Sequence, residues 1–227
     1  MNNLTLELKE LARGLGAADI GAAPADRYHN APEGHRPEDF LPGAVSVITF
    51  TYKINKGPLN NLPRTRNQYM VEFEAANQIL LQMSHKIARF LEEKGYESSA
   101  FGPEASIGDY SRLKGDFSHK HSAVLCGLGH FGINNLLITP QHRTGVRLAS
   151  VATTATLDYA PPSPSKYCEE CLQCVHTCPS GALDGWEGNY DPLTGWTISK
   201  EKCAHYMFVT SQAKRCGICV KACLDKA

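Results

Sequence analysis

Hydrophobic residues recur with a helical period in two segments of the chain. Near the start, leucines at three- and four-residue steps share one face and predict a helix over 5–15: Leu4, Leu8, Leu11 and Leu15. A longer stripe of apolar residues predicts a helix over 68–94 that ends before Gly95. We interpret this second stripe as ordinary core packing, because it continues at the same spacing through the whole segment.

Other segments have the composition of β-strands. Residues 45–52 and 146–156 are rich in β-branched side chains, and 19–23 is expected to begin a short strand. Segments rich in proline, glycine or charge predict loops or irregular structure: 25–42, 57–63 and 96–121. The stretch 160–166 reads APPSPSK and is the clearest linker, so we expect one domain over 1–160 and a second over 161–227.

Composition and charge narrow the functional classes. The 227 residues include 23 basic and 23 acidic side chains, which gives a formal net charge of zero. This balance predicts no nucleic-acid partner and no membrane association. Residues 1–16 are charged and amphipathic and do not resemble a secretory leader, so we expect a cytoplasmic protein of a reducing, anaerobic environment.

Eight of the nine cysteines lie in the last 60 residues. The first block has the bacterial ferredoxin spacing C-x2-C-x2-C-x3-C-P, in which the fourth cysteine crosses to the other cluster. The second block has Ala213 in place of its opening cysteine, and Cys203 can supply the missing thiolate. The spacing therefore predicts two [4Fe–4S] clusters. One would be held by Cys168, Cys171, Cys174 and Cys223, and the other by Cys203, Cys216, Cys219 and Cys178.

Two alternatives explain cysteine-rich tails in other proteins. Disulfides belong mainly to secreted chains, and no secretory leader is evident here. Structural zinc favours paired C-x2-C units rather than three cysteines at two-residue gaps. The remaining cysteine, Cys126, is expected to be a small buried hydrophobic residue.

A glycine-rich segment at 127–132 has the form G-x-G-x-x-G. A dinucleotide-binding loop also needs a following helix and an acidic residue about 20 positions later. The segment instead runs into Pro140, and 147–157 holds no carboxylate, so nicotinamide binding is disfavoured. The glycines serve either a close approach to a bulky ligand or a tight turn beside a buried strand.

Several segments together resemble the epoxyqueuosine reductase and reductive dehalogenase superfamily. The matching stretches are 127–140 (GLGHFGINNLLITP), 146–153 (VRLASVAT), 41–48 (LPGAVSVI) and 15–21 (LGAADIG), together with the cysteine layout. The resemblance implies an α+β fold with a nitroreductase-like N-terminal domain followed by a ferredoxin-like module with two clusters. It also implies a cobalamin held by residues of the glycine-rich segment: Gly127, Gly129, His130, Gly132, Asn134, Leu136 and Leu137.

The chain departs from the family in ways that bear on its activity. It lacks the helical repeats of epoxyqueuosine reductases and the export signal of secreted dehalogenases, so we expect a short stand-alone member with another substrate. The family's acidic proton donor is replaced by Gln68, which makes Tyr69 the first candidate donor. Tyr110, His119 and His121 are further candidates, and Arg143 and Arg147 could bind an acidic group.

Three functions remain open from the sequence. The first is a cobalamin-dependent reductase that takes electrons from a ferredoxin or flavodoxin and reduces a small-molecule substrate. The second is an electron-transfer protein that reduces a partner, for example a corrinoid protein, without an organic cofactor of its own. The third is an FMN-binding reductase, because nitroreductase-like domains often hold flavin.

Overall fold

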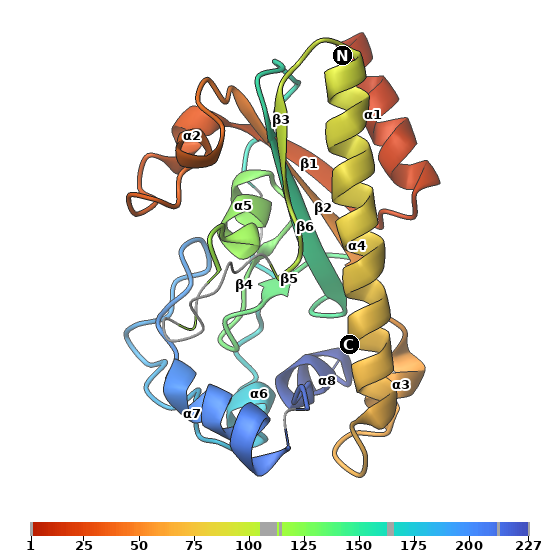
Figure 1. Ribbon diagram of the computed structural model, residues 1–227. Helices are drawn as coiled ribbons and strands as arrows, with labels where there is room; N and C mark the ends of the chain where they lie inside the picture. Colours follow the sequence, from red (N-terminus) through yellow and green to blue (C-terminus); the bar gives the residue numbers. More distant parts are fainter. Residues whose placement is uncertain (1, 105–112, 114, 163–165, 213, 227) are drawn as a thin grey trace.

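The computed structural model describes residues 2–104, 113, 115–162, 166–212 and 214–226. Its larger part is built on a four-stranded antiparallel sheet with the strand order β1-β2-β6-β3 (Figure 1). The strands are β1 (Asp19–Pro24), β2 (Ser46–Lys53), β6 (Val146–Thr153) and β3 (Ser98–Phe101). The α+β fold class and the three strands expected from the sequence are confirmed.

The central strand β2 is buried on both faces. Its alternate residues Ile48 and Phe50 join one hydrophobic cluster, whereas Val47 joins a second cluster on the opposite face. The period of two along a strand produces this division, because successive side chains point to opposite faces. Both clusters consist largely of side chains with almost no solvent exposure, so this sheet carries the main hydrophobic core.

Helices cover the two faces of the sheet unequally. Helix α1 (Asn3–Gly14) and the long helix α4 (Asn67–Glu93) lie side by side and pack against one face (Figure 1). The shorter helix α5 (His119–Leu125) packs against the other face. The bounds of α4 agree with the helix predicted over 68–94, because its apolar stripe is the face that meets the sheet.

Three segments predicted as loops or irregular structure contain short elements. Residues 25–42 include η1 (Ala25–Tyr28) and α2 (Pro37–Phe40), and 57–63 overlaps α3 (Lys56–Asn60). Each is a single turn, too short to produce a hydrophobic period. Within 96–121, strand β3 was not predicted, because its partner β6 lies about 50 positions further along the chain.

The cysteine-rich tail has short elements and little core of its own. It contains α6 (Gln173–His176), α7 (Lys200–His205), the π-helical turn η3 (Tyr206–Thr210) and α8 (Ile218–Leu224). Helix α8 lies beside the N-terminal end of α4, where Ile218 packs with Leu59, Leu62 and Tyr69 (Figure 1). A small two-stranded sheet, β4 (His130–Phe131) with β5 (Leu137–Ile138), lies between the main sheet and the tail.

Within the described residues, no helix is both long and apolar enough to cross a membrane.

Candidate metal centres

Four of the tail cysteines converge on one cavity, which we call cage I: Cys168, Cys171, Cys174 and Cys223. Three come from the first cysteine block around α6, and the fourth comes from α8. Burial raises the pKa of the Cys174 thiol to about 12, and the neighbouring thiols of Cys168, Cys223 and Cys171 contribute to the increase. These four residues are the ones that the sequence spacing assigned to a single cluster.

The other four tail cysteines form a second group, which we call cage II: Cys178, Cys203, Cys216 and Cys219. Burial raises the pKa of the Cys203 thiol, and the nearby Cys216 and Cys178 thiols raise it further. Burial likewise raises the pKa of Cys219, with further contributions from the thiols of Cys216, Cys203, Cys174 and Cys178. Cys178, which follows α6 of the first block directly, is therefore a neighbour of Cys203 and Cys216. Crossed ligation of two clusters stays a prediction.

Within the described residues, the cysteines of the two cages form neither disulfides nor a group that could hold a single metal ion. All nine cysteines are free thiols. Among the described residues, no group of three or more His, Cys, Asp or Glu side chains could hold a single metal ion. A zinc ion with Zn–S bonds of about 2.3 Å would bring its four sulfurs to within roughly 3.8 Å of one another. A [4Fe–4S] cluster does not require that approach, because its own iron and sulfide atoms separate the thiolates, so two clusters stay the prediction for these cysteines.

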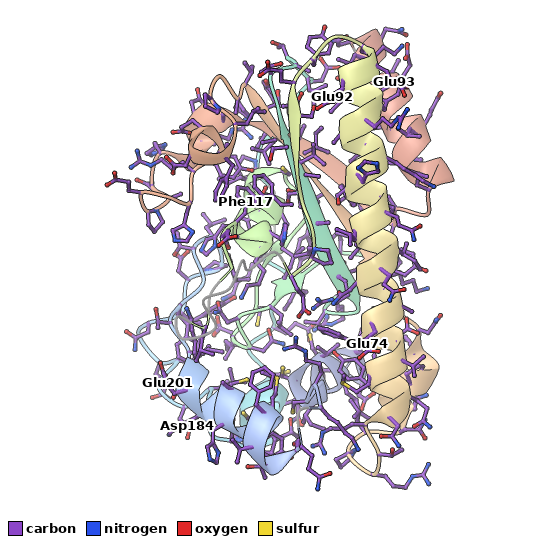
Figure 2. The ribbon with its side chains drawn as sticks, in the orientation of Figure 1. Glu74, Glu92, Glu93, Phe117, Asp184 and Glu201 are labelled. Carbon is purple, nitrogen blue, oxygen red and sulfur yellow. The ribbon has the colours of Figure 1, made fainter. Side chains whose placement is uncertain are left out.

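The electrostatics of each cage also point to a cationic occupant. Neighbouring thiols raise the pKa of Cys174 in cage I and of Cys203 in cage II, because a nearby thiolate disfavours a second negative charge. Four thiolates at partly buried positions become stable only when a positively charged group compensates them. Figure 2 shows sulfur atoms gathered among the helices of the tail, which is where such a group would be held.

Two residues in left-handed backbone conformation shape the cages. Leu172 has φ of 59° just before α6, and Gly217 has φ of 69° just before α8. Each therefore turns the chain sharply between two cysteines of one block. Gly217 has a second reason to be glycine, because a Cβ at this position would lie 2.5 Å from the ring of Tyr69.

Tyr69 lies against cage II. Its side chain is buried in the first turn of α4 and contacts the turn at Gly217. Burial raises the pKa of Tyr69 to about 12, whereas the positive charge of Arg147 acts in the opposite direction. The thiols of Cys219 and Cys216 also raise this pKa. The phenol is therefore protonated at neutral pH, as a proton donor must be.

The glycine-rich segment is packed against its own chain. A Cβ at Gly129 would lie 2.3 Å from the Ile138 carbonyl oxygen, and one at Gly132 would lie 2.6 Å from the Ile138 side chain. A Cβ at Gly127 would lie 2.7 Å from the Pro161 carbonyl oxygen. These approaches favour the tight-turn explanation of the glycines. No helix follows Gly132; the chain enters β5 instead, as expected for a segment that is not a dinucleotide loop.

The remaining members of that segment differ in their accessibility. His130, Asn134 and Leu137 are buried, and Leu136 is partly exposed. Asn134 contacts the tail, because its Nδ2 donates to the Cys219 carbonyl oxygen over 3.4 Å. Contact of these residues with a cobalamin therefore stays a prediction, and in this conformation most of the segment's surface is covered by protein.

The two candidate anion-binding arginines have partners within the chain. Arg143 lines cage I, where its Nε donates to the Cys223 carbonyl oxygen and its Nη1 lies 3.1 Å from Glu169 Oε1. Arg147 donates to Asn77 Oδ1 from both Nε and Nη2. Arg143 thus belongs to the lining of cage I, and Arg147 links β6 to α4 through Asn77.

His119, another candidate donor, ends a chain of buried hydrogen bonds. Its Nε2 lies 2.8 Å from the Gly102 carbonyl oxygen, which only accepts, so Nε2 carries the proton. Its Nδ1 then accepts from Ser150, and the chain continues through Thr49 and Ser122 to the Tyr28 hydroxyl. Burial lowers the pKa of His119 to about 4. The neutral, fully hydrogen-bonded ring is best explained as a structural group.

The structure describes two of the three remaining candidate residues. His121 Nδ1 is 2.6 Å from Ser118 Oγ and its Nε2 is 3.0 Å from the Thr194 carbonyl oxygen. Cys126 is buried, as expected. Tyr110 lies outside the described residues.

Two basic residues beside cage II were not identified from the sequence. Arg66, the residue before α4, donates from Nη2 to the Tyr206 hydroxyl over 2.7 Å. Burial lowers the pKa of Lys120 to about 8, Lys200 lowers it further, and the nearby Cys219 thiol acts in the opposite direction. No motif marks either residue, because Arg66 and Tyr206 are separated by 140 positions.

No protein-family model matches the chain. A tetrachloroethene reductive dehalogenase of Desulfitobacterium hafniense is 26% identical over 237 residues, covering 97% of this chain and 39% of the relative. An epoxyqueuosine reductase of Gloeobacter violaceus is 26% identical over 230 residues, covering 91% of this chain and 66% of the relative. The chain thus spans about two fifths of the dehalogenase and just under two thirds of the epoxyqueuosine reductase.

Solved structures of both types share the fold. An epoxyqueuosine reductase with a tRNA stem loop superimposes with a TM-score of 0.70 at 19% identity, over 99% of this chain and 66% of that chain. A reductive dehalogenase whose structure suggests a mechanism for B12-dependent dehalogenation gives a TM-score of 0.73 at 18% identity. The match covers 95% of this chain and 30% of that chain. Sequence and fold similarity along nearly its whole length places this chain in the superfamily of epoxyqueuosine reductases and reductive dehalogenases.

Proposed function

We propose that the chain is an iron–sulfur oxidoreductase in which cages I and II each hold a [4Fe–4S] cluster that delivers electrons to cobalamin. The observation that carries the proposal is the grouping of eight thiols into two sets of four, each set drawing on both cysteine blocks. A low-potential carrier such as a ferredoxin or flavodoxin would supply the electrons. The substrate would be a small molecule, and the cluster module would occupy 161–227 beside a 1–160 domain.

The protein's own residues have separate tasks in this proposal. The cage cysteines hold the clusters as thiolates, and the partly buried surroundings keep them away from bulk water. When bound, cobalamin would supply a strongly reducing and nucleophilic cobalt centre. Tyr69 would hold the proton that the reduced substrate needs, because its phenol stays protonated far above neutral pH.

A second candidate function is favoured by the packing around Tyr69 and the glycine-rich segment. Tyr69 is 5% exposed, and the space beside Gly129 and Gly132 is filled by Ile138. In this conformation neither region offers a surface for a large planar cofactor. A protein that passes electrons from its clusters to a separate corrinoid protein needs no such surface. The expectation of no nucleic-acid partner likewise stays a prediction, since a structural relative binds a tRNA stem loop.

Anaerobic reconstitution distinguishes these functions. The protein would be loaded with iron and sulfide, exposed separately to cobalamin and to FMN, desalted and examined by visible and EPR spectroscopy. The proposal predicts about eight iron atoms per chain and a retained cobalt(II) signal. Eight iron atoms with no retained organic cofactor would support the electron-carrier function, and a retained flavin spectrum would support an FMN reductase.

Cys126→Ser is a matched control for this experiment, because Cys126 is buried in the sheet domain outside both cages. The variant is expected to bind as much iron as the unaltered protein. About four iron atoms or fewer in the unaltered protein would contradict the proposal.

A further inference from the structure

The two cages differ in the charges placed beside them. In cage I, the guanidinium of Arg143 lies near the Cys223 thiol and is paired with the Glu169 carboxylate at 3.1 Å. Glu170 also lines the cavity and is paired with Lys166. The positive charge at this cage is therefore neutralised locally. Cage II has Arg66 and Lys120 as neighbours, and within the described residues neither forms an ion pair with a carboxylate.

Arg66 is held between the two chain segments that supply cage II. From the α7 side, the Tyr206 hydroxyl accepts its Nη2–H, and the guanidinium lies 5.4 Å from the centre of the Tyr206 ring. Tyr206 follows Cys203 by three positions. From the α8 side, Leu62 and Tyr69, which flank Arg66 in the sequence, both contact the turn at Gly217, next to Cys216. Tyr206 thus fixes the guanidinium, and the packing of Leu62 and Tyr69 against the Gly217 turn places this part of the chain beside α8.

One nitrogen of this fixed guanidinium has no partner. Arg66 Nε is buried and makes no hydrogen bond within the described residues. A buried N–H of a charged group without an acceptor is costly, so its presence calls for an explanation. Burial raises the pKa of the Cys216 thiol and the positive charge of Arg66 lowers it, so the guanidinium lies close to this cysteine. A metal-bound thiolate is a much stronger acceptor than a thiol.

We propose that Arg66 donates a hydrogen bond to the Cys216 thiolate when cage II holds its cluster, and thereby makes this cluster the more readily reduced of the two. Positive charge and N–H donors beside a cluster sulfur stabilise the reduced form, which carries one more negative charge. Beside cage I, Arg143 and Lys166 are each paired with a carboxylate, which offsets this effect. Arg66 is a positioning and tuning residue, and the inference rests on the proposed cluster ligation.

The direction of electron flow follows if the cage II cluster is reduced more readily than the cage I cluster. An electron that enters through cage I moves downhill to cage II, which lies against Tyr69, the proposed proton donor. Each transfer moves one electron: the cluster of cage I is oxidised and the cluster of cage II is reduced, with the external carrier as the reductant.

The test is an EPR-monitored reductive titration of the reconstituted protein. At the potential where half of the cage II cluster is reduced in the unaltered protein, we expect Arg66→Gln to lower the ratio of reduced to oxidised cluster about tenfold, which corresponds to 59 mV for one electron. The cage I cluster should be unaffected. Arg64→Gln is the matched control, because Arg64 is exposed in the same loop and contacts Asn61; its ratio should stay within twofold.

Several outcomes decide the inference. Eight iron atoms per chain with an unchanged ratio in Arg66→Gln would overturn it, as would a cage I cluster that is the more readily reduced. If Arg66→Gln fails to assemble cage II, Arg66→Lys decides instead: it keeps the charge but loses the rigid fork of donors. We expect about a threefold fall in its ratio, and an unchanged ratio would again overturn the inference. An iron content of about four atoms or fewer in the unaltered protein would contradict the proposed function itself.

Discussion

The sheet domain and the cysteine tail are stabilised by different physics. The sheet domain has two hydrophobic clusters, one on each face of β2, built from side chains that are almost completely removed from water. The tail from 166 to 226 has few buried apolar residues, chiefly Ala182, Leu183 and Ile218. Its helices are single turns or little longer. We therefore expect the sheet domain to fold on hydrophobic burial alone, and the tail to depend on what its thiols bind.

Iron removal is the most direct test of this difference between the sheet domain and the tail. Chelation under anaerobic conditions should unfold the tail and leave the sheet domain intact, because only the tail lacks a core of its own. Limited proteolysis followed by mass spectrometry would then show cleavage after about residue 160 and a protected N-terminal fragment. Equal protection of the tail before and after chelation would show that the tail does not need its metal.

A change of pH should affect the sheet domain through His119. Its pKa is lowered from about 6.5 to about 4 by burial, so the unfolded chain takes up the proton first as pH falls. Stability is therefore fully present above pH 6.5 and is lost progressively toward pH 4. The full difference is about 3 kcal/mol, at 1.36 kcal/mol per pKa unit. Denaturant unfolding at pH 7 and pH 4.5 would measure it.

His119→Gln should make the stability of the sheet domain less dependent on pH in this range. His85→Gln is the control, because His85 lies on the exposed face of α4. A pH dependence that survives His119→Gln and disappears in His85→Gln would refute the assignment.

Gly217→Ala tests the contact between the two regions. The new Cβ would lie 2.5 Å from the Tyr69 ring and would need a left-handed backbone at φ of 69°, which alone costs roughly 1–2 kcal/mol. We expect weakened iron binding in cage II and no change in cage I. Gly14→Ala, at a helix position with nothing within 4 Å, should be neutral or slightly stabilising. Full iron content with unchanged stability in Gly217→Ala would contradict this packing.

Local sequence signals predicted the regular parts of the molecule. The strand over 45–52 and the helix over 68–94 have long, strongly patterned side-chain periods, and both exist within a residue or two of the expected bounds. The cysteine spacing also predicted that Cys168, Cys171, Cys174 and Cys223 act together, and these four line one cavity. The crossed ligation that a ferredoxin block encodes stays a prediction. What these predictions share is that the determining contacts are close in sequence or repeat at a fixed interval.

Features that depend on distant contacts were missed. Strand β3 forms through pairing with β6, and α3 is one turn whose stability comes from packing Leu59 against α4 and α8. Arg66 lies in an unremarkable loop, and only the fold brings it to Tyr206 and Cys216. The glycines at 129 and 132 fit two explanations equally well until the position of Ile138 is known.

Crossed ligation is the central claim, and a pair of single substitutions tests it directly. Cys178→Ser and Cys223→Ser would be reconstituted anaerobically and compared by iron content and EPR, with Cys174→Ser as the reference for cage I. Each variant should retain about four of eight iron atoms. Cys223→Ser should lose the same EPR signal as Cys174→Ser, and Cys178→Ser should lose the other one. If Cys178→Ser instead loses the signal that Cys174→Ser loses, each block holds its own cluster and the account is wrong.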